Sequence, residues 1–182
     1  MAAGFQAAAH AVDAGDLASI VNLIDEVEAE FGLIDVLHFH SAALHDGTID
    51  KQEANAVVAD LTVNIGAAVV GVQKVSASML ERGSGSIPVT GGMFAITPNP
   101  DYLSLGIGKA GVRNLTQALF ERFKDDGVHI ALVNVATKVA PGSVESQGVA
   151  EAFWTLRSAP TDQWTCKVPI QTDTFDTFED NL

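Results

Sequence analysis

The sequence predicts an α/β protein in which helices cover both faces of a doubly wound, mostly parallel sheet. Apolar segments of strand length, such as residues 33–39 and 128–135, alternate with longer segments whose apolar residues recur at helical spacing. Each helical segment is long enough for the right-handed crossover that connects neighbouring parallel strands. We therefore expect a three-layer sandwich of helices, sheet and helices.

The N-terminal part of the chain predicts a strand, a helix and a second strand. Residues 5–12 form a short apolar run, and Asp16 then precedes apolar residues at helical spacing as far as Phe31. Gly32 ends the helix, and residues 33–39 are apolar enough for a strand that is buried on both faces. This order is that of a βαβ unit.

A polar stretch, residues 41–60, leads into a long predicted helix at residues 61–82. The apolar side chains of this helix lie on two of its sides, so it needs two packing partners. The sheet supplies one partner. Because two-fold homo-oligomers are the commonest assemblies, we expect the same helix of a second subunit to supply the other, in a homodimer or a homotetramer.

The C-terminal half continues the alternation of strands and helices. We expect one domain over residues 1–171, followed by an acidic tail at residues 172–182. The further predicted elements are strands at residues 86–90, 128–135 and 164–170, a helix at about residues 105–124 that Gly127 ends, and a short helix at residues 149–156.

The charge of the chain excludes several classes of partner. Asp and Glu number 23 against 10 Lys and Arg, so the formal net charge is -13. This charge repels nucleic-acid phosphates and anionic lipid, and no basic cluster offsets it. No unbroken apolar run reaches the length of about eighteen residues that a membrane helix needs, and residues 1–15 lack the cationic start of a signal peptide. The sequence therefore predicts a cytoplasmic protein without nucleic-acid or membrane partners.

Five local motifs follow one another along the chain. They are Asp13 after the first predicted strand, Phe-Gly-Leu-Ile-Asp-Val-Leu at residues 31–37, Val-Asn-Ile-Gly at residues 63–66, Gly-Lys-Ala-Gly-Val at residues 108–112, and the loop at residues 134–142. In this order they resemble the short-chain dehydrogenase/reductase family. The resemblance implies a Rossmann-like fold and an NAD(P)-dependent oxidoreductase that acts on a carbonyl compound or an alcohol.

The resemblance assigns roles to four residues. Asp13 stands where the family has an aspartate beside the adenine, and Asn64 stands where an asparagine holds a water that relays protons. Lys109 matches the lysine that anchors the nicotinamide ribose and depresses the pKa of a tyrosine four residues earlier. His40 lies at residues 39–42, where the family has Asn-Asn-Ala-Gly. We therefore predict cofactor contacts at Asp13, His40 and Lys109, and catalytic roles for Asn64 and Lys109.

Two positions depart from the family's catalytic pattern. Gly92 stands where the serine hydroxyl of the family polarises the substrate, and Leu105 stands where its tyrosine precedes the lysine. Tyr102 lies seven residues before Lys109, on the same side of a continuous helix but one turn, about 5.4 Å, farther along its axis. Tyr102 is therefore predicted as the catalytic acid only with a local rearrangement of the backbone.

The resemblance also implies that this chain lacks the βαβα portion with which the family's domain begins. That portion carries the glycine-rich loop that binds the pyrophosphate at a helix N-terminus, and the strand that selects the ribose. We therefore expect weak binding of NAD or NADP, or none. The strand at residues 33–39 would then have an open edge, which we expect the first strand, moved inward, or another chain to cover.

Two hypotheses about function stay open. The first is an oxidoreductase that acts on a small-molecule carbonyl or alcohol, in which Tyr102 or a bound water is the acid. The second is a non-catalytic scaffold or oligomerising pseudoenzyme. Gly92 and Leu105 favour the second hypothesis because neither side chain has a hydroxyl.

Metal and hydrolase sites are less well supported by the residues. The candidate metal ligands are His38, His40, His45 and Asp46. Histidines at the end of a strand more often bond to backbone and water, so no metal site is expected. Ser41 and Ser104 lie near histidines, but neither is in a nucleophile elbow.

Overall fold

The structure, a computed structural model, describes residues 6–136 and 138–170. Its sheet contains the parallel strands β1 (Gly85–Thr90), β2 (Val128–Val135) and β3 (Lys167–Ile170), in the order β1-β2-β3. Residues 36–39 extend the sheet beyond β1. Val36 and Phe39 form parallel bridges with β1, and the Leu37 N–H donates to the carbonyl oxygen of Ser86 at 3.0 Å. The predicted parallel sheet is therefore confirmed.

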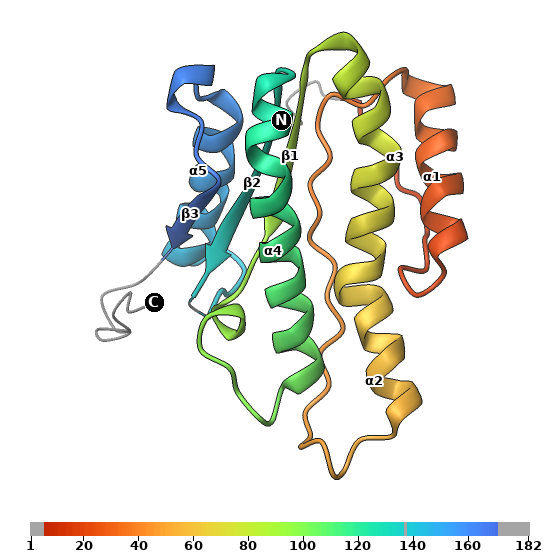
Figure 1. The fold of residues 1–182 in the computed structure, drawn as a ribbon, viewed down its shortest axis with the longest axis vertical. Coiled ribbons are helices and arrows are strands. Elements are labelled where there is room, and N and C mark those ends of the chain that lie inside the picture. Colours follow the sequence, from red (N-terminus) through yellow and green to blue (C-terminus); the bar gives the residue numbers. More distant parts are fainter. Residues whose placement is uncertain (1–5, 137, 171–182) are drawn as a thin grey trace.

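Helices cover both faces of the sheet, as the sequence predicts. One layer contains α1 (Leu17–Phe31), α3 (Ala67–Arg82) and α4 (Leu103–Asp125), and α5 (Val144–Ser158) covers the opposite face (Figure 1). Alternate residues of β2 face the two layers. Ile130 and Leu132 join the core under α3 and α4. Ala131 and Val133 pack with Leu156 of α5, so the three-layer, Rossmann-like class is confirmed.

The main core lies between the sheet and the layer of α1, α3 and α4. Val75 and Met79 of α3 and Val112 of α4 are fully buried. They share one apolar cluster with Ile87 of β1 and Ile130 of β2. Burying each such side chain stabilises the fold by about 1.5–3 kcal/mol. This cluster fixes α4 against the sheet.

The helix α3 is the last part of a continuous 29-residue helix, Ala54–Arg82. This long helix comprises α2 (Ala54–Leu61), a π-helical turn (Thr62–Gly66) and α3. The prediction of a polar stretch outside the helix as far as residue 60 is therefore wrong from Ala54 onward. The physical reason is Asp60, whose charge is typical of a loop but whose carboxylate is buried and accepts a hydrogen bond from α4.

The long helix is apolar enough, by length and composition alone, to cross a bilayer. The core helix of a globular protein meets the same criterion, and α3 does pack into the core through Val72, Val75 and Met79. On its other side α3 contacts α1. We predicted that another subunit packs against the second side of this helix. The helix α1 of the same chain covers part of that side instead.

The predicted first strand at residues 5–12 is wrong over its described part. Residues 6–12 are exposed and form no strand, and they do not move inward to pair with residues 36–39. A strand needs a neighbour that bonds to its N–H and C=O groups, and a short run of mostly alanine buries little apolar surface to hold it there. The helix α1 begins where predicted, because the Asp16 carboxylate accepts the Ala18 N–H at 3.0 Å.

The C-terminal elements follow the predicted order with shifted ends. The bounds of β2 are those predicted, whereas α5 begins at Val144 because the Ser143 hydroxyl oxygen accepts the Ser146 N–H at 3.2 Å. The last strand is shorter than predicted. Trp164 instead donates its indole N–H to the Ala159 carbonyl oxygen at 2.9 Å, in a turn before β3. The predicted tail at residues 172–182 lies outside the described residues.

Candidate active site

A cavity of about 300 Å³ opens beside the carboxyl ends of β1 and β2. Ligands of doubly wound sheets bind at this edge, where the loops after the strands meet. The cavity is lined by Gly92, Met93, Phe94, Leu105, Lys109, Val135 and Lys138. Its wall therefore includes one predicted site residue, Lys109, and the two positions at which this chain departs from the family's catalytic pattern.

Lys109 reaches the cavity from the second turn of α4. Its side chain is buried, with 7% of the residue exposed, and its Nζ donates to the carbonyl oxygen of Thr90 at 3.0 Å. Burial lowers the pKa of Lys109, because removal from water disfavours the charged ammonium. Thr90 is the last residue of β1, so this hydrogen bond fixes the amine at the edge of the sheet.

Gly92 and Leu105 surround the stem of Lys109. A Cβ atom at position 92 would lie 3.5 Å from the Lys109 Cγ, which is ordinary van der Waals contact. The φ angle of Gly92 is -172°, an extended conformation that any residue adopts. Leu105 lies one helical turn before Lys109 on α4. The structure thus has room for a side chain at position 92, but neither position carries a hydroxyl.

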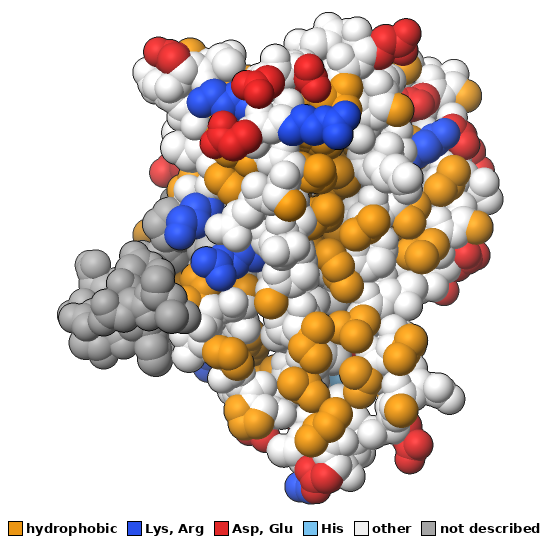
Figure 2. All heavy atoms as spheres, viewed as in Figure 1, with side chains coloured by type: hydrophobic (Ala, Val, Ile, Leu, Met, Phe, Trp, Pro, Cys, Tyr) orange, Lys and Arg blue, Asp and Glu red, His pale blue; other side chains and the backbone are white. Residues whose placement is uncertain are grey.

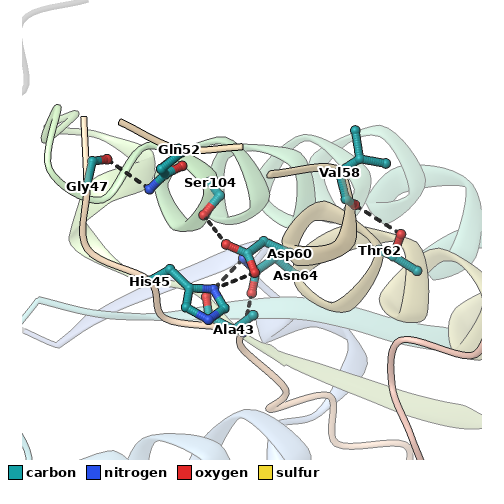
Figure 3. Close-up of polar contacts among 9 residues, drawn as sticks. All are labelled: Ala43, His45, Gly47, Gln52, Val58, Asp60, Thr62, Asn64 and Ser104. Carbon is teal, nitrogen blue, oxygen red and sulfur yellow. Dashed lines mark hydrogen bonds and ion pairs between the residues drawn. The ribbon is translucent and has the colours of Figure 1, made fainter. Parts of the chain in front are cut away.

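Asn64 is buried in the π-helical turn, with 1% of the residue exposed, and bonds to a single partner residue. Its Oδ1 accepts the Ala43 N–H at 2.6 Å, and its Nδ2 donates to the Ala43 carbonyl oxygen at 3.1 Å (Figure 3). The amide therefore ties the segment that follows residues 36–39 to the long helix. The relay of protons through a water at Asn64 stays a prediction.

Tyr102 lies at the N-cap of α4, just before the first helical residue, so the helical spacing to Lys109 does not apply to it. Its ring stacks on Phe94, with the ring centroids 5.3 Å apart and the planes 10° from parallel. Phe94 lines the cavity, whereas Tyr102 is not among the lining residues. Tyr102 therefore supports the wall of the cavity from behind.

His40 belongs to a cluster around Thr90 on the face of the sheet that α5 covers. The Thr90 Oγ1 lies 2.8 Å from Nδ1 of His40 and 3.1 Å from Nε2 of His38. Burial lowers the pKa of His38, and the charge of His40 lowers it further. The ring of His38 lies against Phe153 of α5, 4.2 Å between centroids. Thr90 thus holds two imidazoles through its hydroxyl and Lys109 through its carbonyl.

Asp13 lies in the turn before α1 and is exposed. Its Oδ1 accepts the Gly15 N–H at 2.8 Å, a local turn that occupies one carboxylate oxygen. It is not among the residues that line the cavity. The structure therefore brings together Lys109, His40 and Thr90, and leaves Asp13 in a separate turn.

A buried carboxylate network beside Asn64 was not predicted from the sequence. Asp60, 4% exposed, accepts the Ser104 hydroxyl at 2.6 Å, and its other oxygen lies 2.6 Å from Nδ1 of His45 (Figure 3). His45 therefore pairs with Asp60 rather than with His38 and His40. Within residues 6–136 and 138–170, no three His, Cys, Asp or Glu residues are grouped so as to hold a metal ion. The sequence does contain one indication of this network, because Asp60 is the single acid in an otherwise uncharged stretch of the long helix, residues 54–73.

The glycines of α4 also have a structural explanation. Gly106, Gly108 and Gly111 have the spacing of a phosphate-binding loop, but all three lie inside the helix. A Cβ at position 108 would lie 2.3 Å from the Cβ of Asn64, so glycine is needed for the close approach of α4 to the long helix. This spacing therefore indicates helix packing and not phosphate binding.

Known proteins share the sequence pattern of this chain. The model of the family described as short chain dehydrogenase matches residues 1–155. The 2,3-dihydro-2,3-dihydroxybenzoate dehydrogenase of Bacillus subtilis is 30% identical over 146 residues, 80% of this chain and 53% of that protein. The oxidoreductase asL5 of Sarocladium schorii is 26% identical over 137 residues, 74% of this chain and 55% of that protein. The chain thus spans little more than half the length of these two relatives.

Solved structures share its fold. A metagenomic short-chain oxidoreductase in complex with NADP has a TM-score of 0.82 at 22% identity, over 93% of this chain and 76% of that one. A short-chain dehydrogenase from Rhodopseudomonas palustris has a TM-score of 0.83 at 21% identity, over 94% of this chain and 77% of that one. With the family match over residues 1–155, the predicted resemblance is confirmed, and this chain belongs to the short-chain dehydrogenase family.

Proposed function

We propose that this chain is an NAD(P)-dependent oxidoreductase that acts on a small carbonyl compound or alcohol and binds its cofactor weakly. The observation that carries the proposal is the amine of Lys109, buried 3.0 Å from the last carbonyl of β1 and beside a cavity of about 300 Å³. The relative that was solved in complex with NADP shares the fold, which supports a nicotinamide cofactor. The cytoplasmic location and the absence of nucleic-acid and membrane partners stay predictions.

The described residues suit the nicotinamide ribose of such a cofactor better than its phosphates. The amine of Lys109 donates one hydrogen bond, to the Thr90 carbonyl oxygen, and has a further N–H that can donate to a ribose hydroxyl. We therefore assign Lys109, with His40, to the nicotinamide ribose. We assign Asp13 to the adenine, although one oxygen of its carboxylate already bonds to Gly15. Among the described residues no glycine-rich loop opens a helix toward the phosphates. When bound, the nicotinamide supplies or accepts the hydride.

The catalytic set of this chain lacks both family hydroxyls, since Gly92 and Leu105 occupy their positions. We assign the proton donor to Tyr102, behind the Phe94 wall, or to a water that Asn64 orders. We assign Lys109 to positioning the ribose through its N–H groups. Slow turnover follows from this set, because the acid does not touch the cavity directly.

Titration with NADPH and NADH tests the proposal. A bound nucleotide raises the melting temperature by mass action, and the two tryptophans report binding by fluorescence. We expect a response at millimolar nucleotide that Lys109→Ala weakens and that Lys51→Ala, at an exposed lysine, leaves unchanged. If neither nucleotide at millimolar concentration changes the melting temperature or the fluorescence, this chain is not a nicotinamide-dependent enzyme.

A second candidate function is that of a non-catalytic, oligomerising member of the family. The absence of hydroxyls at positions 92 and 105 favours this second function, and an apolar surface of the molecule also favours it. Hydrophobic side chains gather over α2 and α4 on one face of the molecule (Figure 2). Val58 of α2 is 62% exposed and Ile107 of α4 is 46% exposed, and α2 and α4 contact each other. Such a helix pair suits an isologous contact with a second copy, in a homodimer or a homotetramer.

Sedimentation analysis tests this surface. Val58→Asp and Ile107→Asp are expected to shift the assembly toward monomer, because each places a charge in an apolar contact. The matched control is Val144→Asp at the start of α5, where the valine is 80% exposed and outside this surface. A wild-type protein that sediments as a monomer at micromolar concentration contradicts the oligomerising role.

A further inference from the structure

Lys109 is a buried amine that lines the cavity, and most of the side chains beside it there are apolar. Met93, Phe94, Leu105 and Val135 line the same space. We propose that Lys109 forms imines with small aldehydes and ketones that enter this cavity. This reactivity goes beyond the proposed oxidoreductase function, because it needs no nucleotide.

The cavity has the size and lining of a site for a small carbonyl compound. Its volume of about 300 Å³ is at the lower end of the range for small-molecule sites. Gly92 contributes no side chain beside the stem of Lys109, so the cavity keeps space along the Cγ, Cδ and Cε atoms of the lysine. Leu105 contributes hydrocarbon one turn before Lys109, so no hydroxyl competes there for a carbonyl oxygen.

The hydrogen bond to Thr90 orients the amine without consuming its reactive electron pair. A neutral lysine amine has two N–H groups and one lone pair. One N–H donates to the carbonyl oxygen of Thr90 at 3.0 Å. The lone pair does not take part in that bond, and it is therefore available to attack a carbonyl carbon.

Burial favours the neutral form of the Lys109 amine, which imine formation needs. A lysine in an apolar environment loses the solvation of its ammonium, and burial lowers the pKa of Lys109. Desolvation in an apolar pocket is a recognised way to activate a lysine for imine formation. Each unit by which the pKa falls raises the neutral fraction near pH 7 about tenfold.

The reaction balances without an oxidant or a reductant. The lone pair of Nζ forms a bond to the carbonyl carbon, and one proton passes from the nitrogen to the carbonyl oxygen to give a carbinolamine. The hydroxyl then takes up a second proton, the C–O bond breaks and water leaves as the C=N bond forms, and the nitrogen releases its remaining proton, so that both N–H protons of the amine balance those of the water. One amine and one carbonyl compound thus give one imine and one water.

Reductive trapping with benzaldehyde tests this inference on the full chain without nucleotide. Sodium cyanoborohydride at pH 7 converts the imine to a stable benzyl amine, and peptide mass spectrometry locates it. We expect Lys109 to be labelled severalfold faster than the exposed Lys51, because burial lowers the pKa of Lys109. Because all lysines compete in the same wild-type sample, the result does not depend on whether a variant folds.

Two variants sharpen the assignment. Lys109→Arg keeps a cation but cannot form an imine, so the fast labelling should disappear. Lys51→Arg, at an exposed lysine outside the cavity, should retain the fast labelling. Labelling of Lys109 no faster than that of Lys51 in the wild type overturns the inference.

The result is separable from the test of the oxidoreductase function. Fast labelling of Lys109 in a protein that shows no response to NADPH or NADH supports this inference and contradicts the proposed function. Slow labelling of Lys109 in a protein that does respond to nucleotide contradicts this inference and supports the proposed function.

Discussion

Gly92 lies against the side chain of Lys109, close enough that a Cβ at position 92 would meet the Lys109 Cγ at 3.5 Å. The family places a hydroxyl at this point and a second one at position 105. Because the backbone at Gly92 is extended and the contact is an ordinary one, a serine fits there without strain. The path of the backbone around Lys109 therefore leaves room for a side chain at position 92.

The double variant Gly92→Ser with Leu105→Tyr should increase carbonyl reduction. A positioned acid contributes about a hundredfold or more to the rate, and Lys109 is one turn from position 105 to hold it. The loss of NADPH absorbance with a small aldehyde measures the change. Gly92→Ser with Leu103→Tyr, which places the phenol outside the cavity, is the control. An unchanged rate in a double variant that binds NADPH would show that the active site lacks more than these hydroxyls.

The stability of the protein should increase with pH on the alkaline side because of Lys109. Burial lowers its folded-state pKa below 10.5, so between that pKa and 10.5 the unfolded chain binds more protons than the folded one. The free energy of unfolding therefore rises with pH in this window. Urea denaturation between pH 7 and 10.5 measures it. Lys109→Met should remove this rise, whereas Lys51→Met should keep it; equal slopes in all three proteins contradict the prediction.

Acid should destabilise the protein through His129, on β2. Burial lowers the pKa of this imidazole, and its hydrogen bond to the Thr165 carbonyl oxygen opposes the shift. As the pH falls below 6.5, the unfolded chain therefore takes up a proton before the folded one, and stability is lost. Denaturation at pH 7 and 5 should show a smaller loss for His129→Gln than for wild type. The exposed His10→Gln should behave as wild type, and the prediction fails if His129→Gln loses as much stability as wild type does.

Two glycine-to-alanine variants should have opposite effects. Gly108→Ala brings a methyl group to 2.3 Å from the Cβ of Asn64, so α4 and the long helix must move apart at a cost of about 1–3 kcal/mol. At Gly148 in α5 a Cβ has no atom within 4 Å, and alanine should stabilise that helix by about 1 kcal/mol. Thermal denaturation measures both. A stable Gly108→Ala variant would mean that the two helices are not held in close contact.

The sequence predicts well those elements whose pattern is local. β2 is apolar at nearly every position because helices cover both of its faces, and its predicted ends are those observed. The helix that carries Lys109 is likewise predicted from its local pattern, and α4 covers its predicted range of about residues 105–124. These features depend on neighbours within a few residues along the chain.

What the sequence does not predict depends on neighbours far along the chain. The apolarity of residues 6–12 suggests a strand, but whether a strand forms depends on a partner that their own sequence does not specify. Asp60 suggests a loop, yet Ser104, far along the chain on α4, satisfies its carboxylate inside the fold. Tyr102 fits a helical spacing to Lys109 only if the helix reaches it, and α4 begins one residue later.

The single hydroxyl proton of Thr90 makes the two histidines beside it interdependent. Oγ1 has one proton and two lone pairs, so it can donate to at most one of the rings of His38 and His40, and at least one ring must donate its own N–H to it. The tautomer of one ring therefore restricts that of the other, because the two rings cannot both accept from Oγ1. The carbonyl of the same Thr90 accepts from Lys109. The proton arrangement of the two histidines and the position of the Lys109 amine thus depend on one residue.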